Sequence, residues 1–189
     1  MCLLRLPAVR SVAALAVFSA AAIATVVPRM SLEEVAGRSE RIVHARVVRS
    51  WSGWDRTRSF IWTHYELAVS EWLRGDAGAR FVVSEPGGVV DGVGMQIAGT
   101  PKFDLGDEIV VFAYKTPIEY WRVQGYTQGA YRVDAGPGGL KIVRSATADG
   151  ITILGADPSS ATSAVQKEPS TLSDFKARVR VILDAQEVK

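Results

Sequence analysis

The sequence predicts a mainly β protein, a small OB-like barrel with a β-sandwich as the alternative, carrying a short N-terminal helix and a C-terminal helix. From residue 42 onward, apolar and polar residues alternate in many short runs, which is the period of β-strands. Glycine-rich turns separate these runs. Near the C-terminus the apolar spacing becomes helical. Many short strands joined by glycine-rich turns are typical of closed or paired antiparallel sheets.

Residues 1–24 are predicted to be a secretory signal peptide. Two arginines precede an almost purely apolar run from Val12 to Val27, in which Ala22-Ile23-Ala24 offers a small-x-small cleavage site. The run of about 16 residues is shorter than the roughly 20 that a helix needs to cross a bilayer. We therefore expect export to the periplasm or the extracellular space and no stable membrane span after cleavage. A leader retained as an anchor is the alternative.

Composition limits the chemistry of the mature chain. The only cysteine, Cys2, lies in the leader, so the mature chain would have neither disulfides nor thiolate metal sites. The 22 basic residues include Arg5 and Arg10 of the leader and face 20 acidic ones. This balance predicts no nucleic-acid partner. No cofactor is expected.

Residues 25–40 are predicted to lead into the sheet through a short helix. Ser31-Leu32-Glu33-Glu34 forms a capping-box pattern, with the serine as N-cap and a glutamate three residues later. Residues 41–144 then form the predicted β-barrel domain. Its expected strands lie at 42–48, 60–73, 80–85, 95–98, 108–114, 120–126, 130–134 and 140–144.

Two segments follow the predicted barrel. Residues 145–169 are rich in Ser, Ala, Thr, Asp and Pro, which is typical of an exposed linker. Residues 170–187 are predicted to form a helix packed on the barrel, capped by Thr171. Its apolar stripe consists of Leu172, Phe175, Val179, Ile182 and Leu183.

One face of the predicted hairpin between 42–48 and 60–73 is a candidate ligand site. If Ala45 opposes Tyr65, cross-strand pairing brings the two histidines together with charged and aromatic neighbours. The candidate ligand-binding residues on this face are His44, Arg46, Trp62, His64 and Glu66. Indole faces and charged groups suit a binding platform. Two histidines and one carboxylate would also suit zinc, although no metal site is assigned.

The glycine-rich segment from Pro86 to Gly99 is a second candidate ligand site. Asp91-Gly92 favours a tight hairpin turn, and Asp91 is counted among the candidate ligand residues. No lysine follows the glycines at the spacing of a phosphate-binding loop. The segment is either a structural turn-rich loop or part of a binding surface.

The chain resembles a family of uncharacterised exported bacterial proteins. The family's layout is V-x-G-x-V, a long strand ending near L-K-G, a G-G-x-x-D-G loop and F-x-x-G-E-x-V-x-F. The matching segments are 41–47, 73–75, 86–92, 103–112 and 123–131. The resemblance covers residues 31–134 and implies an exported domain without implying a reaction.

The layout is also similar to the OB-type barrel of tissue inhibitors of metalloproteinases and netrin-like modules. There too a long strand ends before a K-G-like turn, where this chain has Arg74-Gly75. Those inhibitors use an N-terminal cysteine and disulfides, which the mature chain lacks. The similarity therefore implies only the barrel shape.

Three functions remain open from the sequence. The leading hypothesis is an exported non-enzymatic binding module for an envelope or extracellular protein or glycan. The alternatives are a metal-dependent hydrolase centred on His44, His64 and Glu66, and a structural envelope component. No G-x-S-x-G motif occurs and only two histidines are present, so no catalytic residue is assigned.

Overall fold

The computed structural model describes residues 25–76, 78–146, 151–154 and 170–187. The protein is mainly β with one short early helix and one C-terminal helix, as predicted, and it is consistent with a small barrel or sandwich. The helices are α1 (Leu32–Gly37) and α2 (Leu172–Glu187). The first strands are β1 (Thr25–Pro28), β2 (Arg41–Trp54), β3 (Ile61–Arg74), β4 (Arg80–Pro86), β5 (Gly88–Val90) and β6 (Val93–Met95). The later strands are β7 (Glu108–Lys115), β8 (Trp121–Val123), β9 (Ala130–Ala135), β10 (Lys141–Ser145), β11 (Ile151–Leu154) and β12 (Ser170–Thr171).

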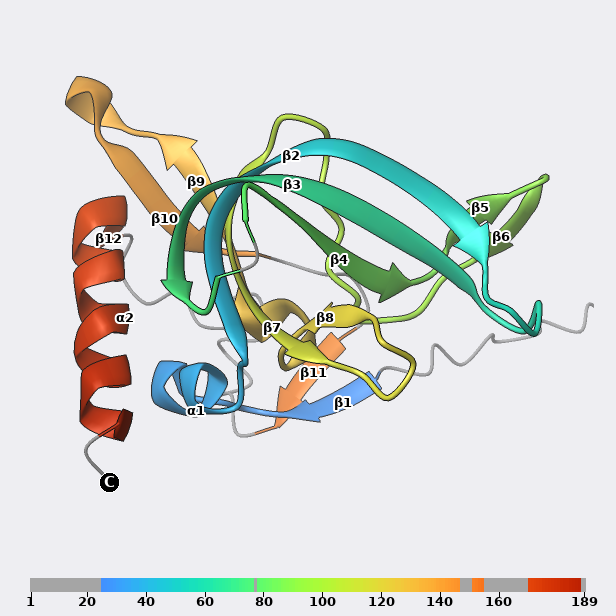
Figure 1. Cartoon of the computed structure of the whole chain (residues 1–189), viewed down its shortest axis with the longest axis horizontal. Helices are drawn as coiled ribbons and strands as arrows, with labels where there is room; N and C mark the ends of the chain where they lie inside the picture. Colours follow the sequence, from blue (N-terminus) through green and yellow to red (C-terminus); the bar gives the residue numbers. More distant parts are fainter. Residues whose placement is uncertain (1–24, 77, 147–150, 155–169, 188–189) are drawn as a thin grey trace, which may run out of the picture.

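One antiparallel sheet organises the molecule. Its strand order is β12-β10-β9-β7-β2-β3-β4, and β8 pairs with the far end of β7. The long strands β2 and β3 arch over β4, β7 and β8 (Figure 1). Within the described strands, no backbone ladder joins β4 to β8. Separate two-stranded units are formed by β1 with β11, in parallel, and by the β5–β6 hairpin.

The curled sheet encloses the first hydrophobic core. Alternation along the strands turns every second side chain inward. The buried inward residues of the strands are Val43, Ala45, Val47, Tyr65, Leu67, Phe81, Val83, Ile109, Val111, Ala113, Val123 and Ala130, and Phe103 from the irregular segment before β7 joins them. Phe81 and Val83 of β4 belong to this inner core, so the next alternate residue of β4 also points into the curled sheet, where the site described below lies.

The two helices cover the outer face of the same sheet. Ile42, Val110 and Phe112 point outward and pack beneath α1 and α2. The predicted stripe of α2 is buried at all five positions. Thr171 caps α2: its hydroxyl accepts from the backbone N–H of Asp174 at 3.1 Å. In α1 the predicted capping box of Ser31 and Glu34 is present. Figure 1 shows α2 along one flank of the sheet.

The pairing of β2 with β3 differs from the predicted register. Ala45 opposes Val69, not Tyr65. The reason is that β2 continues through its polar end to Trp54, in residues predicted to be a turn. The turn begins only at Asp55, whose carboxylate accepts from the backbone N–H groups of Thr57 and Ser59. Bulges along β2 shift the pairing further.

One further prediction differs from the structure. The expected strand at 120–126 ends at Val123, because Gly125 takes a φ of 64° and a 3-10 turn follows. The glycine-rich segment contains the short β5–β6 hairpin. The predicted signal peptide lies outside the described residues, as does most of the predicted linker. Among the described helices, none is both long and apolar enough to cross a membrane.

Candidate functional site

A cavity of about 570 Å³ lies beside the end of β4, under the β5–β6 hairpin and the irregular segment 96–104. Its walls are partly apolar, with Met95, Ile97 and Phe103 among them. The inward faces of β3 and β4 contribute Tyr65 and Glu85. One buried acidic side chain on the inner face of the sheet therefore lines the cavity.

Glycines after β4 allow the chain to close over this cavity. Gly87 and Gly88 take φ angles of 113° and 134°, which disfavour residues with a Cβ. A Cβ on Gly88 would lie 2.5 Å from the hydroxyl oxygens of Ser52 and Thr63. The Thr63 hydroxyl donates to the carbonyl of Gly87 at 2.7 Å. Because of this close approach, the turn into the hairpin is held against the tip of β2–β3.

Glu85 bridges the unpaired gap between β4 and β8, which we call the seam. Its side chain is inward, in register with Phe81 and Val83, and the residue is only 1 % exposed. One carboxylate oxygen accepts from the backbone N–H of Val123 at 2.6 Å, and the other accepts from Nη2 of Arg122 at 3.1 Å. A side chain thus joins two strands where backbone pairing is missing.

The electrostatics of the cavity centre on Glu85. Burial raises the pKa of Glu85 to about 7, and the Arg122 charge and the Val123 N–H offset this rise only in part. Burial also raises the pKa of Tyr65, against a backbone hydrogen bond at Phe103. Carboxyl groups with a pKa near neutrality gather at binding and catalytic sites. Glu85 is therefore able to change its charge under ordinary conditions.

Thr100 supplies an unpartnered hydroxyl to the same cavity. The residue lines the cavity and is 7 % exposed. Its Oγ1 atom is buried and has no hydrogen-bond partner within the described structure. An unpaired buried hydroxyl costs about 1–3 kcal/mol. A ligand that bonded to Thr100 would remove that cost.

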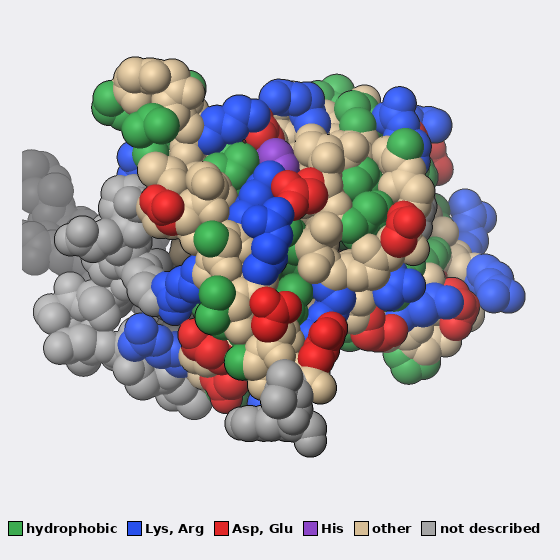
Figure 2. All heavy atoms as spheres, turned by 60° about the vertical axis from the view of Figure 1, so that its left-hand side comes forward, with side chains coloured by type: hydrophobic (Ala, Val, Ile, Leu, Met, Phe, Trp, Pro, Cys, Tyr) green, Lys and Arg blue, Asp and Glu red, His purple; other side chains and the backbone are tan. Residues whose placement is uncertain are grey.

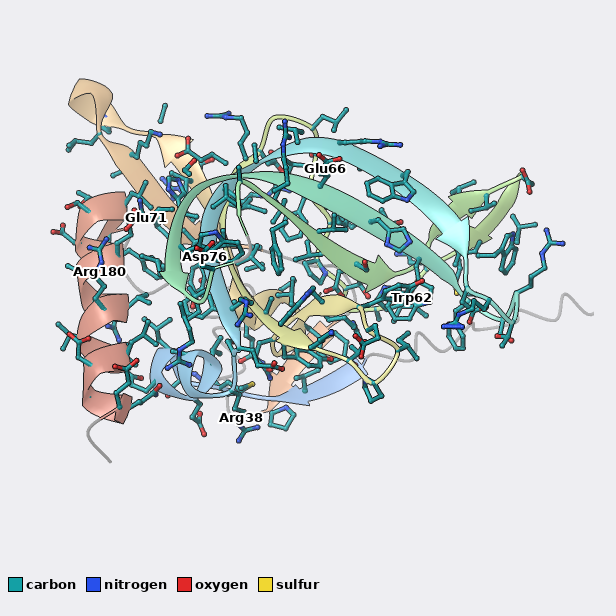
Figure 3. The ribbon with its side chains drawn as sticks, viewed as in Figure 1. Arg38, Trp62, Glu66, Glu71, Asp76 and Arg180 are labelled. Atoms are coloured by element: carbon teal, nitrogen blue, oxygen red, sulfur yellow. The ribbon has the colours of Figure 1, made fainter. Side chains whose placement is uncertain are left out.

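The predicted histidine platform is divided between two regions. His44 opposes Glu71, while His64 opposes Trp51, seven residues further along β2 and therefore roughly 20 Å away. Arg46 opposes Ala68, and Glu66 opposes Arg49. The corrected register explains the separation. Figure 3 shows Trp62 and Glu66 at different heights on β3.

His44 belongs to an ionic cluster on the outer face. Its Nε2 lies 2.7 Å from Oε1 of Glu108, and the same oxygen lies 2.6 Å from Lys141. The other oxygen of Glu108, Oε2, lies 3.1 Å from Arg46. Burial lowers the pKa of His44, against its hydrogen bond with Glu108. Nearby, Glu71 pairs with Lys176 and Arg180 of α2; Figure 3 shows Glu71 and Arg180 close together. Figure 2 shows basic and acidic side chains interspersed on this side of the molecule.

His64 and Trp62 belong to a row of ring contacts that also includes Trp51 and Tyr120. Ring centroids lie 5.2 Å apart for Trp51 and His64, 5.3 Å for His64 and Tyr120, and 5.0 Å for Trp62 and Tyr120. Trp62 is only 8 % exposed, and Arg49 lies over Trp51. Burial lowers the pKa of His64, whose Nδ1 lies 2.7 Å from the Ser84 hydroxyl. The rings mainly contact one another.

Asp91 forms the tip of the β5–β6 hairpin. It takes a φ of 51° and Gly92 a φ of 78°, and the flanking Val90 and Val93 are paired. This is the predicted two-residue turn, of the type that requires positive φ at both positions. Asp91 is exposed and is not among the residues lining the cavity.

The part of the chain that the structure describes contains no set of side chains suited to bind a metal ion. No group of three or more His, Cys, Asp or Glu side chains there could hold a metal ion. In particular, the structure does not bring His44, His64 and Glu66 together.

Sequence reasoning missed Glu85 and Thr100. The signal for Glu85 was present, since it continues the apolar alternation of Phe81 and Val83. An acid on the apolar face of a strand is either paired or functional. Thr100 carries no such signal, because the irregular segment around it has no periodicity.

Comparison with known proteins yields no relative, since neither a protein-family model nor a curated protein matches the chain.

Proposed function

We propose that the protein is an exported, non-enzymatic binding module, and that the cavity beside Glu85 receives part of a glycan or of a protein. The observation that carries this proposal is a fully buried carboxyl group that lines a cavity of about 570 Å³. The exported location rests on the leader pattern of residues 1–24.

Size and lining both support ligand binding. Ligand pockets commonly have volumes of about 300–1,000 Å³, with apolar walls and a few placed polar groups. Here Met95, Ile97 and Phe103 give apolar wall, while Glu85 and Thr100 give polar groups. The polar groups would fix the orientation of a ligand and the walls would exclude water.

Binding rather than catalysis is proposed because of which residues surround Glu85. The residues lining the cavity include no histidine and no cysteine. A carboxyl group alone lacks the paired nucleophile and base on which covalent catalysis depends. Both sites hold a buried polar atom without a hydrogen-bond partner in the described structure, Oγ1 of Thr100 and Nε1 of Trp62. The cavity is favoured over the ring row because it adds a buried carboxyl group and an open volume, whereas the rings pack against one another.

The experiment is a thermal-shift screen of the whole chain against small saccharides and short peptides. Met95→Trp should fill the cavity, because Met95 lines it. Val93→Trp is the matched control, because Val93 lies on the same short strand, is exposed and does not line the cavity. We expect a ligand that raises the Tm of the wild type and of Val93→Trp but not of Met95→Trp. Ligands that shift all three proteins equally would contradict the proposal.

A further inference from the structure

The charges around the cavity are unbalanced. Its lining carries two carboxyl groups, Glu85 and Asp104, and one cation, Lys102. Arg122 reaches Glu85 from β8 and is not part of the lining. Lys102 is exposed, whereas Glu85 is fully buried. The buried part of the cavity therefore presents acidic charge without a cation on the cavity side.

Arg122 compensates Glu85 incompletely. Its charge lowers the pKa of Glu85, but burial dominates. A buried carboxylate is stabilised when further cations or hydrogen-bond donors approach it. Tyr65, on β3, has its pKa raised by burial and by the nearby charges of Glu85 and Asp104, so it is neutral at ordinary pH and brings no positive charge to Glu85. A positively charged group on a ligand would therefore supply the compensating charge that Arg122 alone does not provide.

The hydrogen-bonding groups of the cavity also suit a cation. Each Glu85 oxygen accepts one hydrogen bond at the seam, and carboxylate oxygens have further lone pairs. The Oγ1 of Thr100 is buried, unpartnered and able to accept. A primary ammonium group offers three donors and no acceptor. Its donor set matches these acceptors.

We propose that the ligand carries a primary ammonium group, which donates hydrogen bonds to the Glu85 carboxylate and to the Thr100 hydroxyl. This inference rests on the proposed function and names the ligand chemistry for the same cavity. The same group occurs on amino sugars and on lysine side chains. The shared chemistry is an alkyl ammonium ion next to an uncharged, partly apolar body.

Binding should release a proton. When Glu85 is protonated, its O–H bond breaks as the ammonium group enters: the proton passes to solvent and the electron pair stays on the carboxylate. The charged groups around this step are Arg122 from β8 and Lys102 and Asp104 at the rim, with neutral Tyr65 on β3. Affinity should therefore rise as the pH increases through 7.

The experiment compares 5-aminopentan-1-ol with pentane-1,5-diol, which replaces the ammonium by a hydroxyl, by calorimetry on the whole chain. We expect the amine to bind at least tenfold more tightly than the diol. Between pH 6 and 8 its affinity should rise several-fold, and buffers of different ionisation heat should report proton release. Glucosamine and Nα-acetyl-lysine amide, whose side-chain ammonium is free, then distinguish a sugar amine from a lysine side chain.

Variants locate the effect. Glu85→Gln should abolish the preference for the amine, and Thr100→Val should weaken amine binding several-fold. Asp184→Asn, an exposed acid on α2, should change nothing. If Glu85→Gln does not fold, the threonine variant and the pH dependence decide.

Three outcomes would overturn the inference: equal binding of amine and diol, amine binding that does not change with pH, or binding of neither. The proposed function would survive these outcomes if the wider screen still gives a ligand that Met95→Trp excludes. The proposed function itself would fail if every ligand that raises the Tm of the wild type raises that of Met95→Trp equally.

Discussion

Glu85 is buried and Glu108 is half-buried, and both make ionic contacts, yet their surroundings shift their pKa values in opposite directions. Glu85 has one cation, Arg122, and burial raises its pKa to about 7. Burial acts on Glu108 too, but Lys141 and His44 outweigh it, so that the pKa of Glu108 lies below its usual value. Two half-exposed cations, Arg46 and Lys141, reach Glu108, and His44 contacts it as well.

The difference separates a structural carboxylate from the carboxylate that we propose contacts a ligand. Glu108 on β7 joins His44 and Arg46 of β2 to Lys141 of β10, and its charge is satisfied. Glu85 faces a cavity with its charge only partly satisfied. An incompletely compensated buried charge costs stability, and such costs are found where function requires them.

The largest expected effect is that of removing each carboxylate. Glu85→Ala should lower the free energy of unfolding by about 3–5 kcal/mol, because it leaves the Arg122 charge and the Val123 N–H unpaired at the seam. Glu108→Ala should cost only about 1 kcal/mol, because two of its partners remain hydrated. Urea unfolding at pH 7 measures both. Equal losses would remove the distinction between the two sites.

The second expected effect is on the pH dependence of stability. The pKa of Glu85 rises from 4.5 to about 7 on folding, so the folded state binds more protons between these values. Stability should therefore fall as pH rises from about 4.5 to 7, by on the order of 3 kcal/mol. The effect of Glu108 on the pH dependence of stability has the opposite sign, because the stability that its ionised form contributes is lost as the pH falls below about 4.5.

Urea unfolding across pH 4–8 measures this profile. Glu85→Gln should remove the decline between pH 4.5 and 7, whereas Glu108→Gln should leave that decline and reduce the loss at lower pH. A wild-type stability that is constant from pH 4.5 to 7 would show that Glu85 keeps an ordinary pKa, and the contrast with Glu108 would disappear.

The third expected effect comes from removing one cation at each site. Arg122→Met should cost about 2 kcal/mol at pH 7, less than a broken buried pair usually costs, because Glu85 can take up a proton. Arg46→Met should cost less than about 1 kcal/mol, because His44 and Lys141 still pair with Glu108. Chemical denaturation at pH 7 compares them. If Arg46→Met lost more unfolding free energy than Arg122→Met, then Glu108 and not Glu85 would be the carboxylate that depends on a single cation.

Sequence predicts the parts of the fold that depend on local periodicity. The strong strand at 108–114 and the striped helix at 170–187 are found as expected, because alternation and helical spacing directly reflect burial. The β2–β3 register was missed. Residues 49–54 of β2 read Arg-Ser-Trp-Ser-Gly-Trp, and their two tryptophans lie three positions apart, which breaks the alternation of a strand. The sequence therefore gives no signal that the turn begins at Asp55.

The two glutamate sites were less accessible to sequence reasoning because they join distant segments. Glu85 meets Val123 across 38 positions, and His44 meets Glu108 across 64. Neither contact follows from the spacing of neighbouring residues. The hairpin turn at Asp91-Gly92 was predicted, since turn chemistry is local. The cavity beneath that hairpin depends on how segment 96–104 returns to the sheet.

The smallest expected effect is that of Thr100→Val, which tests whether the cavity holds an unused polar group. Valine keeps the shape of threonine but removes the unpartnered hydroxyl. Stability should therefore stay constant or rise by up to about 1 kcal/mol, while affinity for 5-aminopentan-1-ol falls. The matched control is Thr63→Val, which loses hydrogen bonds with Ser52 and Gly87 and should cost about 1–2 kcal/mol. Thermal and urea unfolding of both variants give the comparison. Destabilisation by Thr100→Val equal to that by Thr63→Val would show that the Thr100 hydroxyl already has a partner, and that Glu85 faces the cavity alone.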